Sequence, residues 1–256
     1  MAKNLILYFS GTGNSLATAK RIAKIVGSTD IKAMASLAQP EGEYERIGFV
    51  FPCYAMGLPR FVKNYIEQID TKKLVSDYYF SVETHGGWPG MSNVQINKIL
   101  RKKGTALSFN INIKMFANYI ALYSMKGDVN ELAEDADKEV SSISESIKNK
   151  MRNANFRGSF LMNIFYAVSL NWLLKRVNGF NVSDNCNGCG MCRKLCPVNN
   201  ISQVEAEKPI IGENCEQCVA CIQWCPKEAI NYKSKTVGRK RYTHPEIKLN
   251  DMILRD

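Results

Sequence analysis

Short apolar runs and stretches of helical periodicity alternate along the first 150 residues. The run Leu5–Phe9 is apolar without interruption, which is typical of a strand buried on both faces of a sheet. Apolar residues then recur at helical spacing from Leu16 to Val26. The same alternation predicts further strands at 31–34, 47–51, 78–83 and 105–113 and helices at 59–69, 92–100 and 128–147, the last two capped by Ser92 and Asp128. Five strands separated by helices predict an α/β fold with a doubly wound parallel sheet.

A longer apolar stretch, Phe160–Leu174, breaks this alternation. It is shorter than the roughly 20 residues that a helix needs to cross a bilayer, and polar residues interrupt it. We interpret it as a buried linker helix within residues 152–180. The pattern leaves open a peripheral membrane helix, a partner-docking helix and a membrane span.

A loop rich in small polar residues follows the first predicted strand. Ser10-Gly11-Thr12-Gly13-Asn14-Ser15 places hydroxyls and glycines where a helix N-terminus presents unpaired amides. A phosphate would be held there by backbone N–H groups and hydroxyls, without a cationic side chain. The loop has neither the Gly-Lys-Ser/Thr ending of a Walker loop nor the GxGxxG pattern. A plain Gly/Ser turn is the alternative.

The cysteines form one pattern that is written twice. Eight of the nine fall into two C-x2-C-x2-C-x3-C-P blocks, which begin at Cys186 and Cys215. In this spacing three thiolates hold one face of a cubane iron–sulfur cluster and the fourth reaches the neighbouring cluster. Zinc would leave the third and fourth cysteines of each block without a role, and a disulfide framework would require a secreted protein. The blocks therefore predict a small ferredoxin-type domain with two 4Fe–4S clusters.

The spacing also predicts which cysteines share a cluster. The first cluster is assigned to Cys186, Cys189, Cys192 and Cys225, and the second to Cys215, Cys218, Cys221 and Cys196. Because so small a domain has little core, the clusters are expected to supply much of its folding energy. The expected division of the chain is 1–151 for the α/β domain, 152–180 for the helical linker, 181–232 for the ferredoxin-type domain and 233–256 for a basic tail.

The polar loop and the cysteine blocks together carry a family resemblance. Ser10–Ser15, directly after LILYF, is similar to the FMN phosphate loop of flavodoxins, S/T-x-T-G-N-T/S. With the cysteine repeat downstream, the whole chain resembles the flavodoxin–ferredoxin fusion proteins of anaerobic bacteria and archaea. The runs Pro52–Pro59, Asn118–Ile120 and Gly238–Tyr242 also resemble that family.

The resemblance implies FMN and two 4Fe–4S clusters as cofactors, and a flavodoxin-like sheet. The phosphate would be bound by the loop from Ser10 to Ser15, and the ring would lie between the loops that follow the third and fourth strands. Tyr54 and Trp88 are the implied stacking aromatics, with local packing as the alternative. The other implied flavin-site residues are Pro52, Gly57, Thr84, His85, Gly86, Gly87, Asn118 and Tyr119.

Two reactive side chains in these loops have competing interpretations. Cys53 is expected to be a buried, inert thiol. His85 could pass a proton to a reduced flavin, or it could serve packing alone. Residues 1–150 hold 19 basic and 15 acidic residues, whereas free flavodoxins are typically acidic, so the chain departs from the family in its docking surface.

The formal net charge of +10 counts the cysteines as neutral. Two clusters with their thiolates and one flavin phosphate would lower it to about +4, and no recognition motif for nucleic acid accompanies the charge. The tail at 233–256 is either a basic patch for an acidic redox partner or an arm folded over the cluster domain.

The expected function is electron transfer between the clusters and FMN, with protein donors and acceptors. The alternative is an FMN-dependent oxidoreductase that reduces a small molecule, and a non-redox iron–sulfur protein is a third class. No signal-peptide pattern precedes the first strand, which favours a cytoplasmic protein.

Overall fold

The protein is described by a computed structural model that covers residues 3–36, 39–125, 127–153, 156 and 158–254. Residues 154, 155 and 157 of the expected linker and 255–256 of the expected tail lie outside this set. The N-terminal half is a five-stranded sheet in the order β2-β1-β4-β6-β7. Its strands are β1 (Asn4–Tyr8), β2 (Thr29–Ala33), β4 (Arg46–Pro52), β6 (Tyr79–His85) and β7 (Leu107–Lys114).

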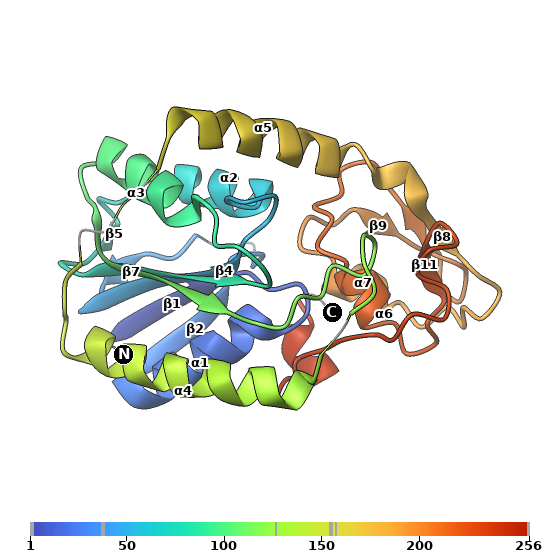
Figure 1. Cartoon of the computed structure of the whole chain (residues 1–256), viewed down its shortest axis with the longest axis horizontal. Helices are drawn as coiled ribbons and strands as arrows, with labels where there is room; N and C mark the ends of the chain where they lie inside the picture. The colour runs from blue at the N-terminus through green and yellow to red at the C-terminus, as the bar shows by residue number, and fades with distance from the viewer. Residues whose placement is uncertain (1–2, 37–38, 126, 154–155, 157, 255–256) are drawn as a thin grey trace.

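The order and direction of these strands establish the fold class. All four strand pairs are parallel, and when the five strands are counted along the chain their order is 2-1-3-4-5. This is the flavodoxin-like order of a doubly wound sheet, as predicted. Helices cover both faces, as Figure 1 shows. One face carries α1 (Asn14–Val26) and α4 (Val129–Lys148), and the other carries α2 (Arg60–Gln68) and α3 (Ser92–Lys102).

Each face of the sheet has its own apolar core. Side chains alternate between the two faces of a strand, so Leu5 and Leu7 pack on one side and Ile6 on the other. All three are almost completely buried. This explains why the first strand is apolar without interruption in the sequence.

The two predicted helix caps differ in outcome. Asp128 precedes α4, and its side chain accepts hydrogen bonds from the backbone N–H groups of Asn130 and Glu131, which confirms that cap. Ser92 is instead the first residue of α3, whose N-cap is Met91, and no side chain of the described residues caps the helix. The prediction for Ser92 was wrong by one residue, because the turn at Gly90 and Met91 starts the helix earlier.

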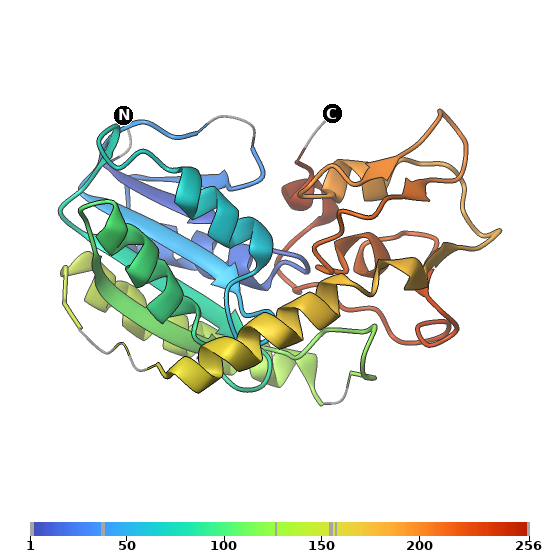
Figure 2. The same ribbon diagram turned by 90° about the horizontal axis from the view of Figure 1, so that it is seen from above.

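The helix α5 (Phe160–Leu174) forms where the sequence predicted it, but it is not buried as expected. Of its residues only Leu173 is buried. The side of α5 that holds Tyr166 docks on the chain, where the Tyr166 hydroxyl donates to the Leu58 carbonyl at 2.7 Å and the ring fills the space beside Gly57. Since apolar residues are present on both sides of α5, docking one side leaves apolar residues of the other side exposed. Figures 1 and 2 show α5 as an outer layer that runs across to the C-terminal domain.

The C-terminal domain consists of short elements around the cysteine blocks. Two small antiparallel pairs, β8 with β11 and β9 with β10, frame the helices α6 and α7. Its core also includes Ile120 and Ala121, which come from the loop after β7. The N-terminal domain therefore contributes part of the small domain's core. The elements are β8 (Phe180–Val182), α6 (Met191–Leu195), β9 (Ile201–Ser202), β10 (Ile210–Ile211), α7 (Ala220–Gln223) and β11 (Ile230–Tyr232).

The tail after β11 packs back along the molecule. Arg239 donates to the Ile120 carbonyl, and Arg241 donates to the side-chain oxygen of Asn231. These contacts favour the interpretation of the tail as an arm folded over its own chain. The remaining short elements are β3 (Gly42–Glu43), β5 (Leu74–Val75) and 3-10 turns at Val177–Gly179 and Leu249–Met252. Searched over the described residues, the helices include none with the length and apolar character of a membrane span.

Candidate cofactor sites

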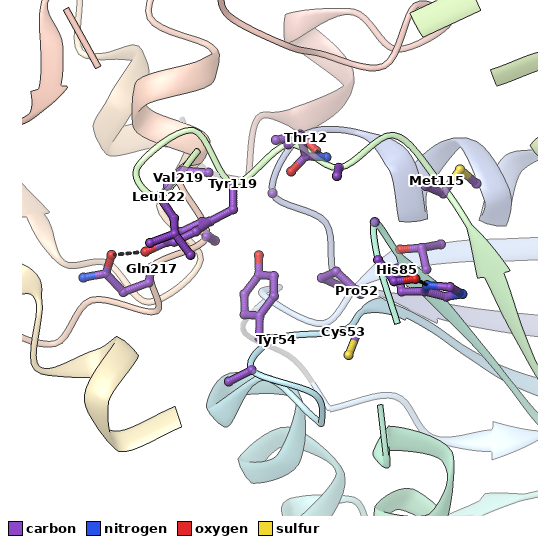
Figure 3. Close-up of a pocket in the computed structure, with 18 of the residues that line it drawn as sticks. Thr12, Pro52, Cys53, Tyr54, His85, Met115, Tyr119, Leu122, Gln217 and Val219 are labelled. Carbon is purple, nitrogen blue, oxygen red and sulfur yellow. Dashed lines mark hydrogen bonds between the residues drawn. The ribbon is translucent and has the colours of Figure 1, made fainter. Parts of the chain in front are cut away.

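A cavity of about 600 Å³ lies at the carboxyl edge of the parallel sheet. Its walls come from the loops after β1, β4, β6 and β7, from the second half of α5, and from residues 217–219 of the cysteine domain. Figure 3 shows side chains from the four loops and from the cysteine domain around one space. Ligands of doubly wound sheets bind at this edge, where the strand order reverses. All of the predicted flavin-site residues except Gly13 and Gly57 line this cavity.

The predicted phosphate loop forms the turn between β1 and α1. Gly13 is the N-cap of α1 with a φ of 101°, and its N–H donates to the Ser10 hydroxyl at 3.1 Å. Among the described residues no side chain caps α1. The loop carries the Ser15 hydroxyl, which bonds Thr84 at 2.8 Å, and the Thr12 hydroxyl. A helix start with uncapped amides and nearby hydroxyls can bind a phosphate without a cationic side chain.

The two predicted stacking aromatics lie in different environments. Tyr54 points into the cavity (Figure 3), and its hydroxyl lies close to Gly11 of the phosphate loop. Burial, reinforced by the neighbouring Cys218 and Glu216, raises the pKa of Tyr54 well above its usual value, so the phenol stays neutral. Trp88 lines the cavity as well, but the residue is 82% exposed.

A hydrogen-bonded bridge closes the cavity on the side of the cysteine domain. Asn118 donates to the Thr12 hydroxyl at 2.9 Å, and the Tyr119 hydroxyl donates to the side-chain oxygen of Gln217 at 3.1 Å (Figure 3). Gln217 is only 1% exposed, and its Nε2 group has no hydrogen-bond partner among the described residues. A buried donor without a partner in a cavity wall is suited to bind a ligand.

Sequence reasoning did not identify Gln217. The residue stands between Cys215 and Cys218, and the cysteine spacing does not constrain the residues between the cysteines. Its backbone is left-handed, with a φ of 55°, and so is that of Val219 at 53°. A β-branched residue at positive φ is strained, and such strain tends to occur at functional sites. No sequence pattern could have shown this conformation.

Cys53 and His85 both lie in the cavity wall. Burial and the nearby Glu83 raise the pKa of the Cys53 thiol, which favours the interpretation as an inert thiol. The Nδ1 group of His85 donates to the Gly87 carbonyl at 2.8 Å, because that oxygen can only accept. This bond fixes the imidazole beside the cavity.

The eight cysteines of the repeat line two small hollows. One is lined by four of them, which we call the outer group: Cys186, Cys189, Cys192 and Cys225. The other is lined by the remaining four, which we call the inner group: Cys196, Cys215, Cys218 and Cys221. In each hollow the fourth cysteine of one block stands with the first three of the other block. This arrangement matches the ligand sets that the spacing predicts.

Within each group, the thiols also raise one another's pKa. Burial raises the pKa of Cys192 to about 11, and the thiols of Cys225, Cys189 and Cys186 add to this effect. Burial likewise raises the pKa of Cys215 to about 11, with Cys196 as the cysteine that adds most. Thiols that oppose one another's ionisation bind as thiolates only when a cation is present, so the residues fit an iron-containing group.

The described His, Cys, Asp and Glu side chains include no group of three close enough to share one metal ion. A cubane does not require such a meeting point, because each of its four cysteines binds a different iron atom.

The inner group and the large cavity share a wall. Cys218 lines both its own hollow and the cavity, whereas none of the outer group lines the cavity. A Cβ atom on Gly11 would lie 2.5 Å from the Cys218 carbonyl oxygen, so only glycine permits this approach. Trp224 also donates its indole N–H to the Gly11 carbonyl at 3.0 Å. The phosphate loop therefore contacts the backbone that carries the inner group.

Comparison with known protein families identifies the cysteine-rich part of the chain. A family model described as a 4Fe-4S dicluster domain matches residues 179–226. No curated protein matches the chain.

Solved flavodoxins resemble the N-terminal part. A flavodoxin from the domain Archaea is 14% identical, with 57% of this chain and 98% of that chain covered and a TM-score of 0.39. A two-electron reduced flavodoxin from Megasphaera elsdenii is also 14% identical, with 56% and 98% covered and a TM-score of 0.37. Because both TM-scores are low, the assignment of the fold rests on the strand order of the sheet alone.

Proposed function

We propose that this chain, which joins a flavodoxin-like domain to a 4Fe–4S dicluster domain, carries electrons between two 4Fe–4S clusters and a bound FMN. The 4Fe–4S dicluster domain supports electron transfer through iron–sulfur clusters as the basic role of the chain. FMN, when bound, exchanges one or two electrons, whereas each cluster exchanges one. The combination would convert one-electron traffic into two-electron traffic.

One observation carries the proposal. Cys218 belongs to the inner group and also lines the cavity at the carboxyl edge of the sheet. A cluster held by the inner group would therefore be a neighbour of whatever the cavity binds. The outer group includes Cys189, whose exposure suits it to meet an electron-transfer partner at the surface.

The residues of the cavity suit FMN in particular. The uncapped start of α1 and the hydroxyls of Ser10, Thr12 and Ser15 would hold the phosphate. Tyr54 would lie against the ring, and the buried Nε2 of Gln217 would donate a hydrogen bond to it. Tyr119 would hold Gln217 in place for this contact. The partners would be protein donors and acceptors in a reducing, cytoplasmic environment.

A protein electron donor tests whether electrons reach the flavin through the clusters. Such a donor is too large to enter a cavity of about 600 Å³ and reduce the flavin directly. The holo-protein, reconstituted anaerobically, is mixed with a reduced small ferredoxin, and the loss of flavin absorbance is recorded. The comparison is a Cys221→Ala variant that has lost the inner cluster but still binds FMN. We expect flavin reduction to slow by about tenfold or more in the variant. An unchanged rate would refute the relay.

The mouth of the cavity favours a second candidate function. Because Trp88 is largely exposed, it does not close the cavity, and a small molecule could reach a bound flavin. The protein would then be a flavin-dependent reductase supplied through its clusters. Reoxidation of the reduced holo-protein by small acceptors distinguishes the two functions. A reductase would show a rate that saturates with one acceptor class, whereas a relay would show rates that follow acceptor potential alone.

A further inference from the structure

The outward side of α5 is an apolar stripe, defined here as Leu161, Phe165, Val168 and Trp172. These residues recur at helical spacing, and each is between 51% and 76% exposed. The helix contains no charged residue. Tyr166 and Leu173, on the opposite side, are the ones that pack against the chain. A contiguous exposed apolar surface of this kind marks a site of interaction.

The surroundings of the stripe are positively charged. Exposed Lys175 follows α5 directly, and the guanidinium of Arg176 lies 4.3 Å from the centre of the Trp172 ring. The helix α3, on the same face of the sheet, carries Lys98 and two further cations but no acidic residue. On the opposite face, α4 carries six acidic residues against two lysines. The apolar stripe and these cations therefore lie on the same side of the sheet, opposite the acidic α4.

We propose that α5 docks the protein on the surface of an anionic lipid bilayer, with the helix lying in the plane of the membrane. A helix of 15 residues is about 22 Å long, which is too short to cross a hydrocarbon core of about 30 Å. An apolar stripe flanked by cations instead suits the boundary between headgroups and acyl chains. A protein partner is less well matched, since the stripe offers few groups for the hydrogen bonds of a protein interface.

Docking in this way would place the cavity at the membrane surface. Val168 and Trp172 belong both to the stripe and to the cavity wall. The inference does not depend on the proposed electron relay, because it rests on surface residues alone.

Vesicle sedimentation of the full-length holo-protein tests the proposal. We expect binding to vesicles of phosphatidylcholine mixed with phosphatidylglycerol, and little binding to phosphatidylcholine alone. Phe165→Glu should weaken binding to the anionic vesicles by about tenfold or more, because it places a charge in the apolar stripe. The matched control is Ile210→Glu, which changes an apolar residue that is 71% exposed on the cysteine domain. Iron and flavin contents of each variant report its folding.

The contribution of charge is tested separately. Replacing Lys98 and Arg101 together with glutamine should weaken binding by about fivefold for each cation lost. Three results would overturn the proposal. The wild-type protein could fail to sediment with anionic vesicles, or Phe165→Glu could bind as well as the wild type. Light scattering could also show a dimer that Phe165→Glu separates, in which case a second copy covers the stripe.

Discussion

The outer and inner cysteine groups have the same spacing in the sequence but different surroundings in the fold. The outer group includes the exposed Cys189, and none of its four cysteines lines the large cavity. In the inner group, burial raises the pKa of Cys218 and Cys221 well above the usual value, and Cys218 also forms part of the large cavity wall. Two cysteine groups with the same sequence spacing therefore differ in their surroundings. The outer group is suited to contact with a partner, and the inner group is suited to contact with a bound cofactor.

The difference shows that the environment of each group comes from the rest of the chain. Loops after β1 and β4 pack against the inner group, through Gly11 and Tyr54. The hydrogen bond from Trp224 to Gly11 fixes this contact. Burial and nearby hydrogen bonds set cluster potentials, so the two clusters should differ in potential although their ligands are alike.

The largest expected effect comes from substitutions that each remove one of the two clusters. Cys225→Ala should remove the outer cluster and leave the inner one, because Cys225 stands with Cys186, Cys189 and Cys192. Iron content should fall from about eight to about four atoms per chain, as measured by chemical analysis and paramagnetic resonance. Cys196→Ala should have the reciprocal effect on the inner cluster. Loss of the cluster at Cys215, Cys218 and Cys221 in the Cys225 variant would show that the ligand sets are wrong.

A second change separates the inner group from the phosphate loop. In Gly11→Ala the new Cβ would meet the Cys218 carbonyl oxygen at 2.5 Å, and a backbone atom cannot easily move aside. Strain of about 1–3 kcal/mol should weaken FMN binding by about fivefold to 150-fold, as measured by fluorescence titration. Gly87→Ala, also in the cavity wall, is the comparison, because its Cβ would meet no atom of the described chain within 4 Å. Equal losses in both variants would contradict the close contact at Gly11.

A substitution of Arg241 should have a smaller effect, and this effect should reach the clusters of both groups. Its guanidinium is mostly buried near Cys225 of the outer group and Cys221 of the inner group, and its Nε lies 3.8 Å from a carboxylate oxygen of Glu228. A cation stabilises the more negative, reduced form of a cluster. Arg241→Gln should therefore lower the cluster midpoint potentials by tens of millivolts, where about 59 mV is a tenfold change for one electron. Arg241→Lys, which keeps the charge, should shift them less. Unchanged potentials in Arg241→Gln would show that the guanidinium does not act on the clusters.

The smallest expected effect concerns pH. His244 is 2% exposed, and its backbone N–H donates to the Thr12 carbonyl of the phosphate loop. Burial, with a further contribution from Arg21, lowers the pKa of His244 below its usual value, so the unfolded chain takes up a proton more readily than the folded one. Stability should be complete above about pH 6.5 and fall as the pH drops below that value.

Thermal unfolding of the anaerobic holo-protein between neutral and mildly acidic pH measures this loss. His244→Gln should flatten the pH dependence. An equally steep dependence in the variant would assign it to other groups.

Much of the fold could be predicted because it depends on local patterns. The uninterrupted apolar strand Leu5–Phe9 and the helical periodicity up to Val26 identified the first strand and helix, and their repetition identified the sheet. The exposed side of α5 was mispredicted, because the apolar sequence of the helix predicts burial. The sequence of the helix does not show how much of its surface the rest of the protein can cover.

The candidate site was only partly predictable. The cysteine spacing is set by cluster geometry, so it predicts which four cysteines line each hollow. In contrast, Gln217 enters the cavity wall because the cysteine domain folds against the sheet. That contact joins residues about 200 positions apart, such as Gly11 and Trp224, and no local pattern encodes it.

An anaerobic crystal structure of the holo-protein, with iron located by anomalous scattering, tests the proposed path of electrons most directly. We expect two groups of four iron atoms, and FMN in the cavity at the carboxyl edge of the sheet. The cluster held by Cys196, Cys215, Cys218 and Cys221 should be the one nearer to the flavin ring. A flavin bound elsewhere, or one that lies nearer to the cluster held by the outer group, would refute transfer through the inner cluster.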